Sequence, residues 1–246
     1  MPTLPFGPLE KTYLQRNKIY SAGAVPAVVC RLADVALKSR QAVAQYAKAV
    51  LDCLRRAWAP VVKRADAEFF PVVLHAVKRG DESPCGTFGA NNDAFYCADG
   101  WGIYIDWQDF VENKEYDRAQ TAGWIRYTMA HEFGHHVQQL VGISTYFDER
   151  SGRARGQVAL QETRRHELQA SCFASAFFGA NQETLGLYGD KLDDYEWNAH
   201  SGDDDPPAST HDHGSHQSST YWADTAFKAK SPSACNTWTA PPTKVS

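Results

Sequence analysis

The chain has 246 residues, 43% of them apolar, so it can bury a substantial core in one domain or in a domain with a small appendage. This composition excludes fibrous, collagenous and disordered proteins. There are 25 Lys and Arg against 29 Asp and Glu, and the formal charge of −4 argues against nucleic acid as a principal partner. The longest mostly apolar run, residues 170–180, is too short to cross a bilayer, so the sequence predicts no membrane span.

The first part of the chain predicts an arm, a helix and two strands. Residues 1–33 are rich in Pro and Gly and predict an extended arm. Residues 39–58 carry apolar side chains at helical spacing, and Pro60 is expected to end this helix. Residues 69–77 and 102–106 predict strands, which a turn-rich segment joins.

The second part predicts two long helices and a polar C-terminal region. Residues 121–141 and 156–178 have apolar faces at helical spacing, with a polar and irregular stretch over 143–155 between them. An acidic, His-containing stretch over 193–216 predicts a mostly solvated loop. A helical or irregular piece around residues 221–227 closes the chain.

Six cysteines form an even set, and none lies in a CxxC pair, which favours disulfides over a zinc knuckle or a redox motif. Local spacing lets one pair close across a turn and another along the N-terminal helix, and elimination leaves the third. The expected disulfides are Cys85–Cys97, Cys30–Cys53 and Cys172–Cys235. Six buried free thiols in a cytosolic protein are the alternative.

Disulfides are typical of oxidising compartments, so we expect an extracytoplasmic or secreted protein. Residues 1–14 lack the basic stretch and apolar run of a signal peptide. We therefore expect that a leader was removed before this numbering begins.

His131, Glu132 and His135 form an HExxH motif inside the helix predicted over 121–141. Residues four apart lie on the same face of a helix, so both imidazoles can bind one metal ion. Glu132 lies beside that ion, where its carboxylate can take a proton from an activated water and pass it to a leaving amine. A pair of hydrogen-bonded structural histidines is the alternative.

A catalytic zinc ion needs a third protein ligand and one open position. The pattern HExxHxxGxxH would supply a histidine, but Gln138 and Gly142 stand where its glycine and its third histidine belong. A carboxylate from the helix over 156–178 can replace it, with Glu162 and Glu167 as candidates. We favour Glu167 because apolar residues after it anchor that part of the helix to the core. A surface glutamate is the alternative.

The sequence HEFGHHVQ, followed by ELQAS on the next predicted helix, resembles the bacterial neutral zinc metallopeptidase family. The resemblance extends over about residues 17–238 and includes the landmarks NKIY, CLRRAW, FYC and HGS. It implies a thermolysin-like site in which His131, His135 and Glu167 bind zinc and Glu132 is the general base.

The chain departs from that family at two places. Family members have ELQAD where this chain has Ser171, and such an aspartate supports a ligand histidine through a hydrogen bond. They also carry a Gln-Arg pair shortly after the His-Gly-Ser motif, where this chain has Ser218 and Ser219. These differences favour the rival hypothesis, a non-catalytic zinc-binding protein of the cell envelope or an interaction module with a degenerate peptidase site.

A peptidase also needs a hydrogen-bond donor for the developing oxyanion. His213 is the first candidate because of its family-like motif, with Tyr104 and Tyr221 behind it. Membership of a solvated His-rich stretch is the alternative for His213. The strand over 102–106 is a candidate edge to which a peptide substrate adds as another strand.

These patterns predict an α+β, zincin-like metallopeptidase domain with a small sheet, an HExxH helix and a second ligand-bearing helix. The predicted division is an N-terminal arm and helix over 1–65, packed on a catalytic domain over 66–246. The predicted function is zinc-dependent hydrolysis of a peptide or protein substrate, with Glu132 as general base. A nucleophilic hydrolase has less support because the chain has no GxSxG elbow. The sequence leaves the oligomeric state, the cleavage preference and the native metal open.

Overall fold

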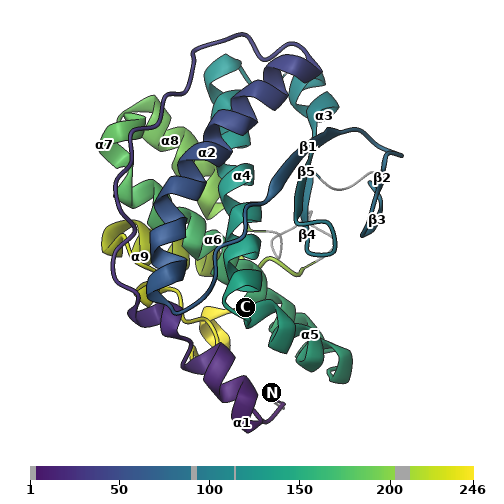
Figure 1. Cartoon of the computed structure of the whole chain (residues 1–246), viewed down its shortest axis with the longest axis vertical. Helices are drawn as coiled ribbons and strands as arrows, with labels where there is room; N and C mark the ends of the chain where they lie inside the picture. Colours follow the sequence, from purple (N-terminus) through teal and green to yellow (C-terminus); the bar gives the residue numbers. More distant parts are fainter. Residues whose placement is uncertain (1–3, 90–92, 114, 203–210) are drawn as a thin grey trace.

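The computed structural model describes residues 4–89, 93–113, 115–202 and 211–246. Helices dominate this structure, and a small sheet lies to one side of the long helices (Figure 1), in agreement with the α+β class. The α-helices are α1 (Pro8–Glu10), α2 (Arg40–Arg64), α3 (Trp107–Glu112), α4 (Arg118–Leu140), α5 (Ile143–Arg153), α6 (Gln157–Ala180), α7 (Gln182–Leu185), α8 (Asp190–His200) and α9 (His216–Ala229). Short helical turns of other types are η1 (Lys11–Gln15), η2 (Lys18–Ser21), η3 (Pro232–Ala234) and η4 (Pro242–Lys244).

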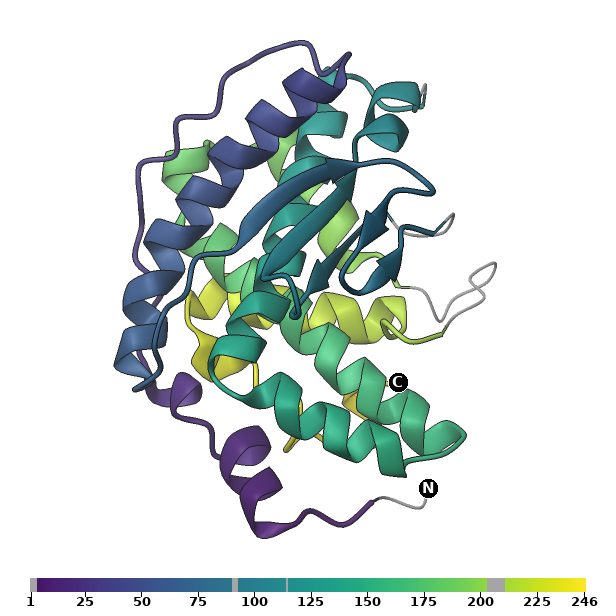
Figure 2. The same cartoon turned by 45° about the vertical axis from the view of Figure 1, so that its right-hand side comes forward.

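The sheet has the strand order β1-β5-β4, with β5 parallel to β1 and antiparallel to β4. Its strands are β1 (Val73–Val77), β4 (Ala94–Cys97) and β5 (Gly102–Asp106), and a separate small hairpin pairs β2 (Glu82–Ser83) with β3 (Gly86–Thr87). Figure 2 shows the sheet in front of α4, with α2 running alongside β1.

The prediction that residues 102–106 form an edge strand is wrong. They form β5, which pairs with a strand on each side and whose five residues are all buried, so it has no edge to offer. At the outer edge of β1, Arg40 Nε donates to the carbonyl of Ala76 at 3.1 Å, and Arg55 donates to the carbonyl of Val72. The edge of this sheet that lies next to α4 therefore belongs to β4.

The N-terminal region is more helical than predicted. Its described residues form α1, η1 and η2 within the arm that was expected to be extended. Helix α2 continues through Pro60 to Arg64, although a proline removes one backbone hydrogen bond. Val61 and Val62 in that last turn are fully buried, so side-chain packing offsets the lost bond.

Two other segments that were predicted to be irregular are helical. Helix α5 occupies most of the stretch over 143–155, and the acidic stretch begins within α8. Only Tyr195 and Ala199 of α8 are buried, so its apolar pattern is too sparse to show a helix in the sequence. Residues 203–210 of the predicted loop lie outside the described residues.

One large hydrophobic core joins the N-terminal region to the rest of the chain. Helix α2 packs on α4, and α6 packs on both α4 and α9. Trp58, Phe133 and Phe173, from α2, α4 and α6, are among its largest fully buried side chains. The helix that carries the HExxH motif is thus held on several sides. The division of the chain at residue 65 stays a prediction.

The three expected disulfides are present. Their Cα atoms are 5.6, 5.8 and 5.6 Å apart, within the range that disulfide geometry requires. They tie the segment before α2 to that helix, the turn before β4 to β4, and α6 to the C-terminal segment. The pairs are Cys30–Cys53, Cys85–Cys97 and Cys172–Cys235.

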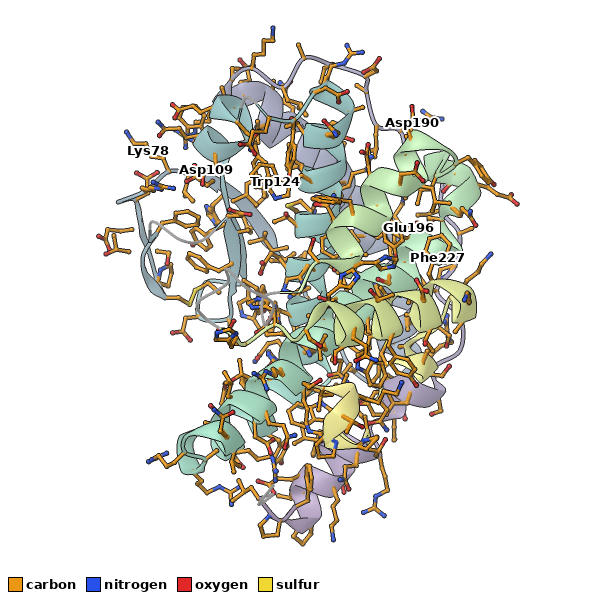
Figure 3. All side chains as sticks on the ribbon, turned by 180° about the vertical axis from the view of Figure 1, so that it is seen from behind. Lys78, Asp109, Trp124, Asp190, Glu196 and Phe227 are labelled. Carbon is orange, nitrogen blue, oxygen red and sulfur yellow. A yellow bond between two sulfur atoms is a disulfide. The ribbon has the colours of Figure 1, made fainter. Side chains whose placement is uncertain are left out.

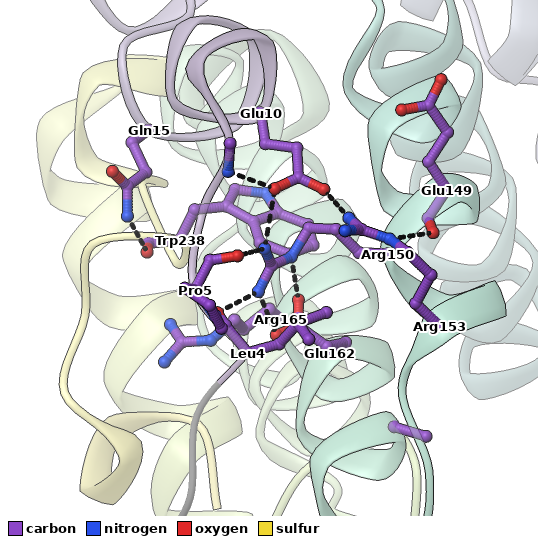
Figure 4. Close-up of polar contacts among 12 residues, drawn as sticks. Leu4, Pro5, Glu10, Gln15, Glu149, Arg150, Arg153, Glu162, Arg165 and Trp238 are labelled. Carbon is purple, nitrogen blue, oxygen red and sulfur yellow. Dashed lines mark hydrogen bonds and ion pairs between the residues drawn. The ribbon is translucent and has the colours of Figure 1, made fainter.

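A buried arginine on α5 anchors the N-terminal segment (Figure 4). The side chain of Arg150 is 0% exposed, and its guanidinium donates to Glu162 at 2.7 and 2.8 Å and to Glu10 at 3.1 Å. It also donates to the carbonyl of Leu4 at 2.9 Å and lies 3.7 Å from the centre of the Phe6 ring. One cation therefore links the N-terminal segment, α5 and α6.

Replacing Arg150 with Met is expected to lower the free energy of unfolding by about 3–5 kcal/mol, because Glu162 would stay buried without its ion-pair partner and Glu10 would keep only the exposed Arg153. Urea denaturation followed by circular dichroism measures this change. Arg118→Met is the matched control, since Arg118 is exposed and pairs with the exposed Asp34, and it should cost about 1 kcal/mol or less. Equal losses in the two variants would contradict the anchoring role of Arg150.

Candidate metal centre

Two helices bring the predicted site residues together. Helix α4 carries His131, Glu132 and His135, and α6 carries Glu167. Gly134 lies where these helices approach most closely, because a Cβ atom at this position would be 2.6 Å from the carbonyl oxygen of Ala170. Glycine in the HExxH motif therefore allows the close approach that sets Glu167 opposite the two histidines.

The three candidate ligands form one compact group, with ligand atoms all within 4.8 Å of one another. The Nε2 atoms of His131 and His135 are 3.1 Å apart, and Glu167 Oε2 lies 3.4 Å and 3.0 Å from them, respectively. A tetrahedral zinc ion with bonds of about 2.0 to 2.1 Å places its ligand atoms about 3.3 Å apart. Two imidazoles and a carboxylate at these distances fit such an ion.

Hydrogen bonds orient both imidazole rings. His135 Nδ1 donates to Gln138 Oε1 at 2.9 Å, while the amide nitrogen of Gln138 donates to the carbonyl of His166 at 2.8 Å. On the other ring, His131 Nδ1 lies 3.0 Å from Ser171 Oγ. With each Nδ1 engaged in this way, both Nε2 atoms face the same point and can bind a metal. The sequence analysis treated Gln138 only as a departure from another motif and missed this role.

Burial and charge act together on the pKa values of the group. Burial lowers the pKa of His131 to about 4. Burial also opposes charge on His135, but the neighbouring Glu167 outweighs it and raises the pKa of His135 to about 9. Burial disfavours the ionised form of Glu167, yet His135 and the other histidines hold its pKa well below the usual value. The carboxylate of Glu167 is thus ionised and available as a ligand.

Glu132 lies in the same place but is not one of the three grouped ligands. It is buried, and this burial raises the pKa of its carboxyl group to about 7. The backbone of Tyr96, on the edge strand β4, acts in the opposite direction and lowers this pKa. Glu132 therefore lies between the candidate metal centre and the sheet edge.

His213 reaches the centre from the segment before α9. Its Nε2 atom is 3.4 Å from Glu167 Oε2, its Nδ1 atom is 2.7 Å from Asp212 Oδ1, and its side chain is half exposed.

The other candidate residues named from the sequence lie elsewhere. Tyr104, a reserve candidate for the oxyanion, is stacked between His75 and Phe95. The ring of Tyr221 lies under the ammonium group of Lys244, and neither tyrosine lines the two cavities beside the metal centre. Glu162, the reserve ligand, is paired with Arg150.

His166 is a further residue of the site that the sequence analysis missed. Its ring is stacked between those of His135 and Phe147, at 4.9 and 4.2 Å, and its Nε2 atom is 3.2 Å from Ser144 Oγ. Its Nδ1 atom lies 3.7 Å from Glu167 Oε1. The sequence signal was its position next to Glu167, but α5, which supplies two of its neighbours, was not predicted as a helix.

Two cavities meet at the candidate centre. One has a volume of about 500 Å³ and the other about 370 Å³. Both are lined by Ala94, His131, Glu132 and His213. Ser219, one of the two serines at the expected Gln-Arg position, lines the larger cavity. The centre therefore lies at the junction of two spaces that are large enough for side chains of a substrate.

Ser171 offers a direct test of the ring orientation at His131. Ser171→Ala removes the 3.0 Å contact with Nδ1 and is expected to weaken zinc binding by about tenfold, whereas Ser171→Asp should strengthen it because a carboxylate is a stronger acceptor. Competition with a fluorescent chelator measures both affinities. Ser175→Ala, one turn further along α6, is the control and should leave the affinity unchanged. Equal affinities for all four proteins would exclude a role for Ser171.

The fold and this centre define the class: a mixed α+β protein whose two long helices form a candidate His-His-Glu metal centre. A family described as "Putative neutral zinc metallopeptidase" matches residues 26–238, so the chain belongs to that family. None of the described helices combines the length and the apolar character that a membrane span needs.

Two curated relatives match much of the chain. Uncharacterized protein YpfJ of Escherichia coli K12 is 25% identical over 206 residues, which are 79% of this chain and 71% of YpfJ. Uncharacterized protein Rv2575 of Mycobacterium tuberculosis H37Rv is 30% identical over 181 residues, 63% of this chain and 58% of Rv2575. No solved structure shows significant similarity to the chain.

Proposed function

We propose that the protein is a zinc-dependent peptidase with a zincin-like catalytic site. The observation that carries this proposal is the group of His131, His135 and Glu167, whose ligand atoms lie within 4.8 Å of one another beside the carboxyl group of Glu132. Membership of the zinc metallopeptidase family supports zinc as the metal. Ligand sets of two histidines and a glutamate also bind other first-row metal ions.

In the proposed reaction, Nε2 of His131, Nε2 of His135 and Oε2 of Glu167 would hold the zinc ion. When bound, it supplies Lewis acidity that activates water and polarises the peptide carbonyl. Glu132 accepts the proton of the attacking water and then donates it to the leaving amine. Burial raises the pKa of Glu132 to about 7, which suits a general base that works near neutral pH and supports this role.

His213 is proposed to stabilise the oxyanion that develops during the attack. Its Nε2 atom faces the centre, and its contact with Asp212 through Nδ1 restricts the ring. A donor held in this way needs little reorganisation during the reaction.

The substrate is proposed to be a peptide or protein that pairs with β4. This strand, and not β5, has its edge beside the centre, and its residues Ala94 and Tyr96 line the smaller cavity. An extended peptide can add to such an edge through backbone hydrogen bonds and bring a peptide bond to the metal. The three disulfides support an extracytoplasmic location, because disulfides persist in oxidising compartments.

Metal analysis combined with a cleavage assay tests this function. The purified protein should bind one equivalent of zinc and cleave a quenched fluorescent casein or peptide library. A chelator should abolish the cleavage, and added zinc should restore it. One equivalent of zinc without chelator-sensitive cleavage of any library would overturn the peptidase proposal and favour the rival, a zinc-binding protein without catalysis.

A further inference from the structure

The larger of the two cavities lies on the side of the centre where α4 begins. Its walls come from the first residue of β4, the first half of α4 and the C-terminal end of α8. Its volume of about 500 Å³ falls in the range of ligand sites. Because His131 and Glu132 line both cavities, a peptide that crosses the metal centre can place one of its side chains here.

Aromatic side chains form much of the cavity wall. They are Tyr116, Trp124, Tyr127 and Trp197. Trp124 is held by edge contacts with Phe110 at 4.5 Å and Tyr116 at 5.6 Å, and Figure 3 shows it on the side of α4 that faces the sheet. Trp197 on α8 is 70% exposed, a high value for the largest aromatic side chain. Rigid rings of this kind attract cations over their faces.

The charged groups of the cavity are acidic or histidine. Asp93 and Glu132 line it, together with two histidines, and no Lys or Arg is among its described lining residues. Burial raises the pKa of Asp93 and the nearby carboxylates of Asp109 and Asp106 raise it further, whereas the side chain of Trp124 and the cation of Arg79 lower it. A cation in the cavity would relieve this repulsion. The neutral lining groups are hydroxyls and amides, which suit a polar side-chain end better than an apolar one.

We propose that this cavity binds a long basic side chain, Arg or Lys, of the peptide substrate. The alkyl stem would lie along the aromatic wall of the cavity, and the cationic end would reach Asp93. This inference rests on the proposed peptidase function and names the substrate class that the site selects. An acidic side chain would face Asp93 and is excluded on the same grounds.

The test uses zinc-loaded protein and peptides that differ at one position beside the cleaved bond. The four peptides carry Arg, Lys, norleucine or Glu there, and norleucine keeps the four-carbon stem of Lys without its ammonium group. Cleavage of the Arg and Lys peptides should exceed that of the norleucine peptide by about fivefold in kcat/KM, mainly through KM, and the Glu peptide should be the poorest. The position is varied on each side of the cleaved bond in turn.

Variants assign the preference to the cavity. Asp93→Asn and Trp197→Ala should each lower the ratio of Lys to norleucine cleavage by about threefold. Asp190→Asn removes the same charge from the far end of α8, and Tyr188→Ala removes an aromatic side chain that is 57% exposed, outside the cavity. These two controls should keep the ratio of the wild type. Thermal unfolding checks that all four variants are folded.

Binding separates this inference from the proposed function. Glu132→Gln protein with zinc is titrated with fluorescently labelled, uncleaved Lys and norleucine peptides, and polarisation reports the Kd. Tighter binding of the Lys peptide, lost in a Glu132→Gln protein that also carries Asp93→Asn, supports the basic pocket even if no cleavage is ever observed. Equal affinities, or a preference for norleucine, would overturn it while leaving peptidase activity intact.

Discussion

Glu132→Gln is expected to lower the rate of peptide cleavage by about 10²- to 10⁴-fold while one equivalent of zinc stays bound. Glutamine has nearly the same shape as glutamate but cannot accept the proton of the attacking water. The position is not one of the three grouped ligands, so the substitution leaves the metal its three protein ligands. Initial rates on a fluorescent peptide and metal analysis of the same sample measure the two quantities.

The matched control is Glu149→Gln, which makes the same change at an exposed position of α5. It should keep both the zinc and the activity of the wild type. An active Glu132→Gln protein would refute its role as the base. Loss of zinc from that variant would instead place Glu132 among the groups that hold the metal.

His135→Ala is expected to have the largest effect on metal binding. Its Nε2 atom lies 3.1 Å from that of His131 and 3.0 Å from Glu167 Oε2, so its removal takes away one of three protein ligands. Loss of a hydrogen bond that supports a ligand lowers metal affinity by about 10- to 100-fold. We expect the loss of a ligand itself to lower zinc affinity by more than this, with activity lost in parallel. Glu167→Gln should act in the same direction, because an amide is a weaker ligand than a carboxylate.

His200→Ala is the control for this experiment. His200 is partly exposed, pairs with Asp224 and lies outside the candidate centre. The His200→Ala protein should bind zinc with the affinity of the wild type in a competition titration. Wild-type affinity in both His135→Ala and Glu167→Gln would mean that the metal lies elsewhere, and the proposed centre would have to be abandoned.

Local sequence patterns predicted the parts of the site that depend on a single helix. His131 and His135 face the same way because residues four apart share a helix face, and this holds wherever the helix packs. The same reasoning placed Glu167 on a core-facing part of α6. The cysteine pairs could also be predicted from the sequence, because two of them close over short distances along the chain and the third follows by elimination.

Features that depend on contacts between distant segments were beyond these patterns. Gln138 lies one turn after His135 on the same helix, but its amide is held in place by the carbonyl of His166 and the side chain of Gln169 on α6. His166 belongs to the site because α5 folds back beside it and supplies Phe147 and Ser144. Helix α5 itself has few apolar residues and is anchored through the buried charge network of its arginine, which a hydrophobic pattern does not report.

The sequence by itself determined the donor set: two imidazoles one helical turn apart, a neighbouring carboxylate, and a second carboxylate on another helix. The tertiary structure alone decided which strand has an edge beside that centre, which side chains orient the rings, and what lines the cavities on either side. The physical reason is that helical periodicity is a property of neighbouring residues. Strand order, helix crossings and cavity walls depend instead on the packing free energy of segments that lie far apart in the chain.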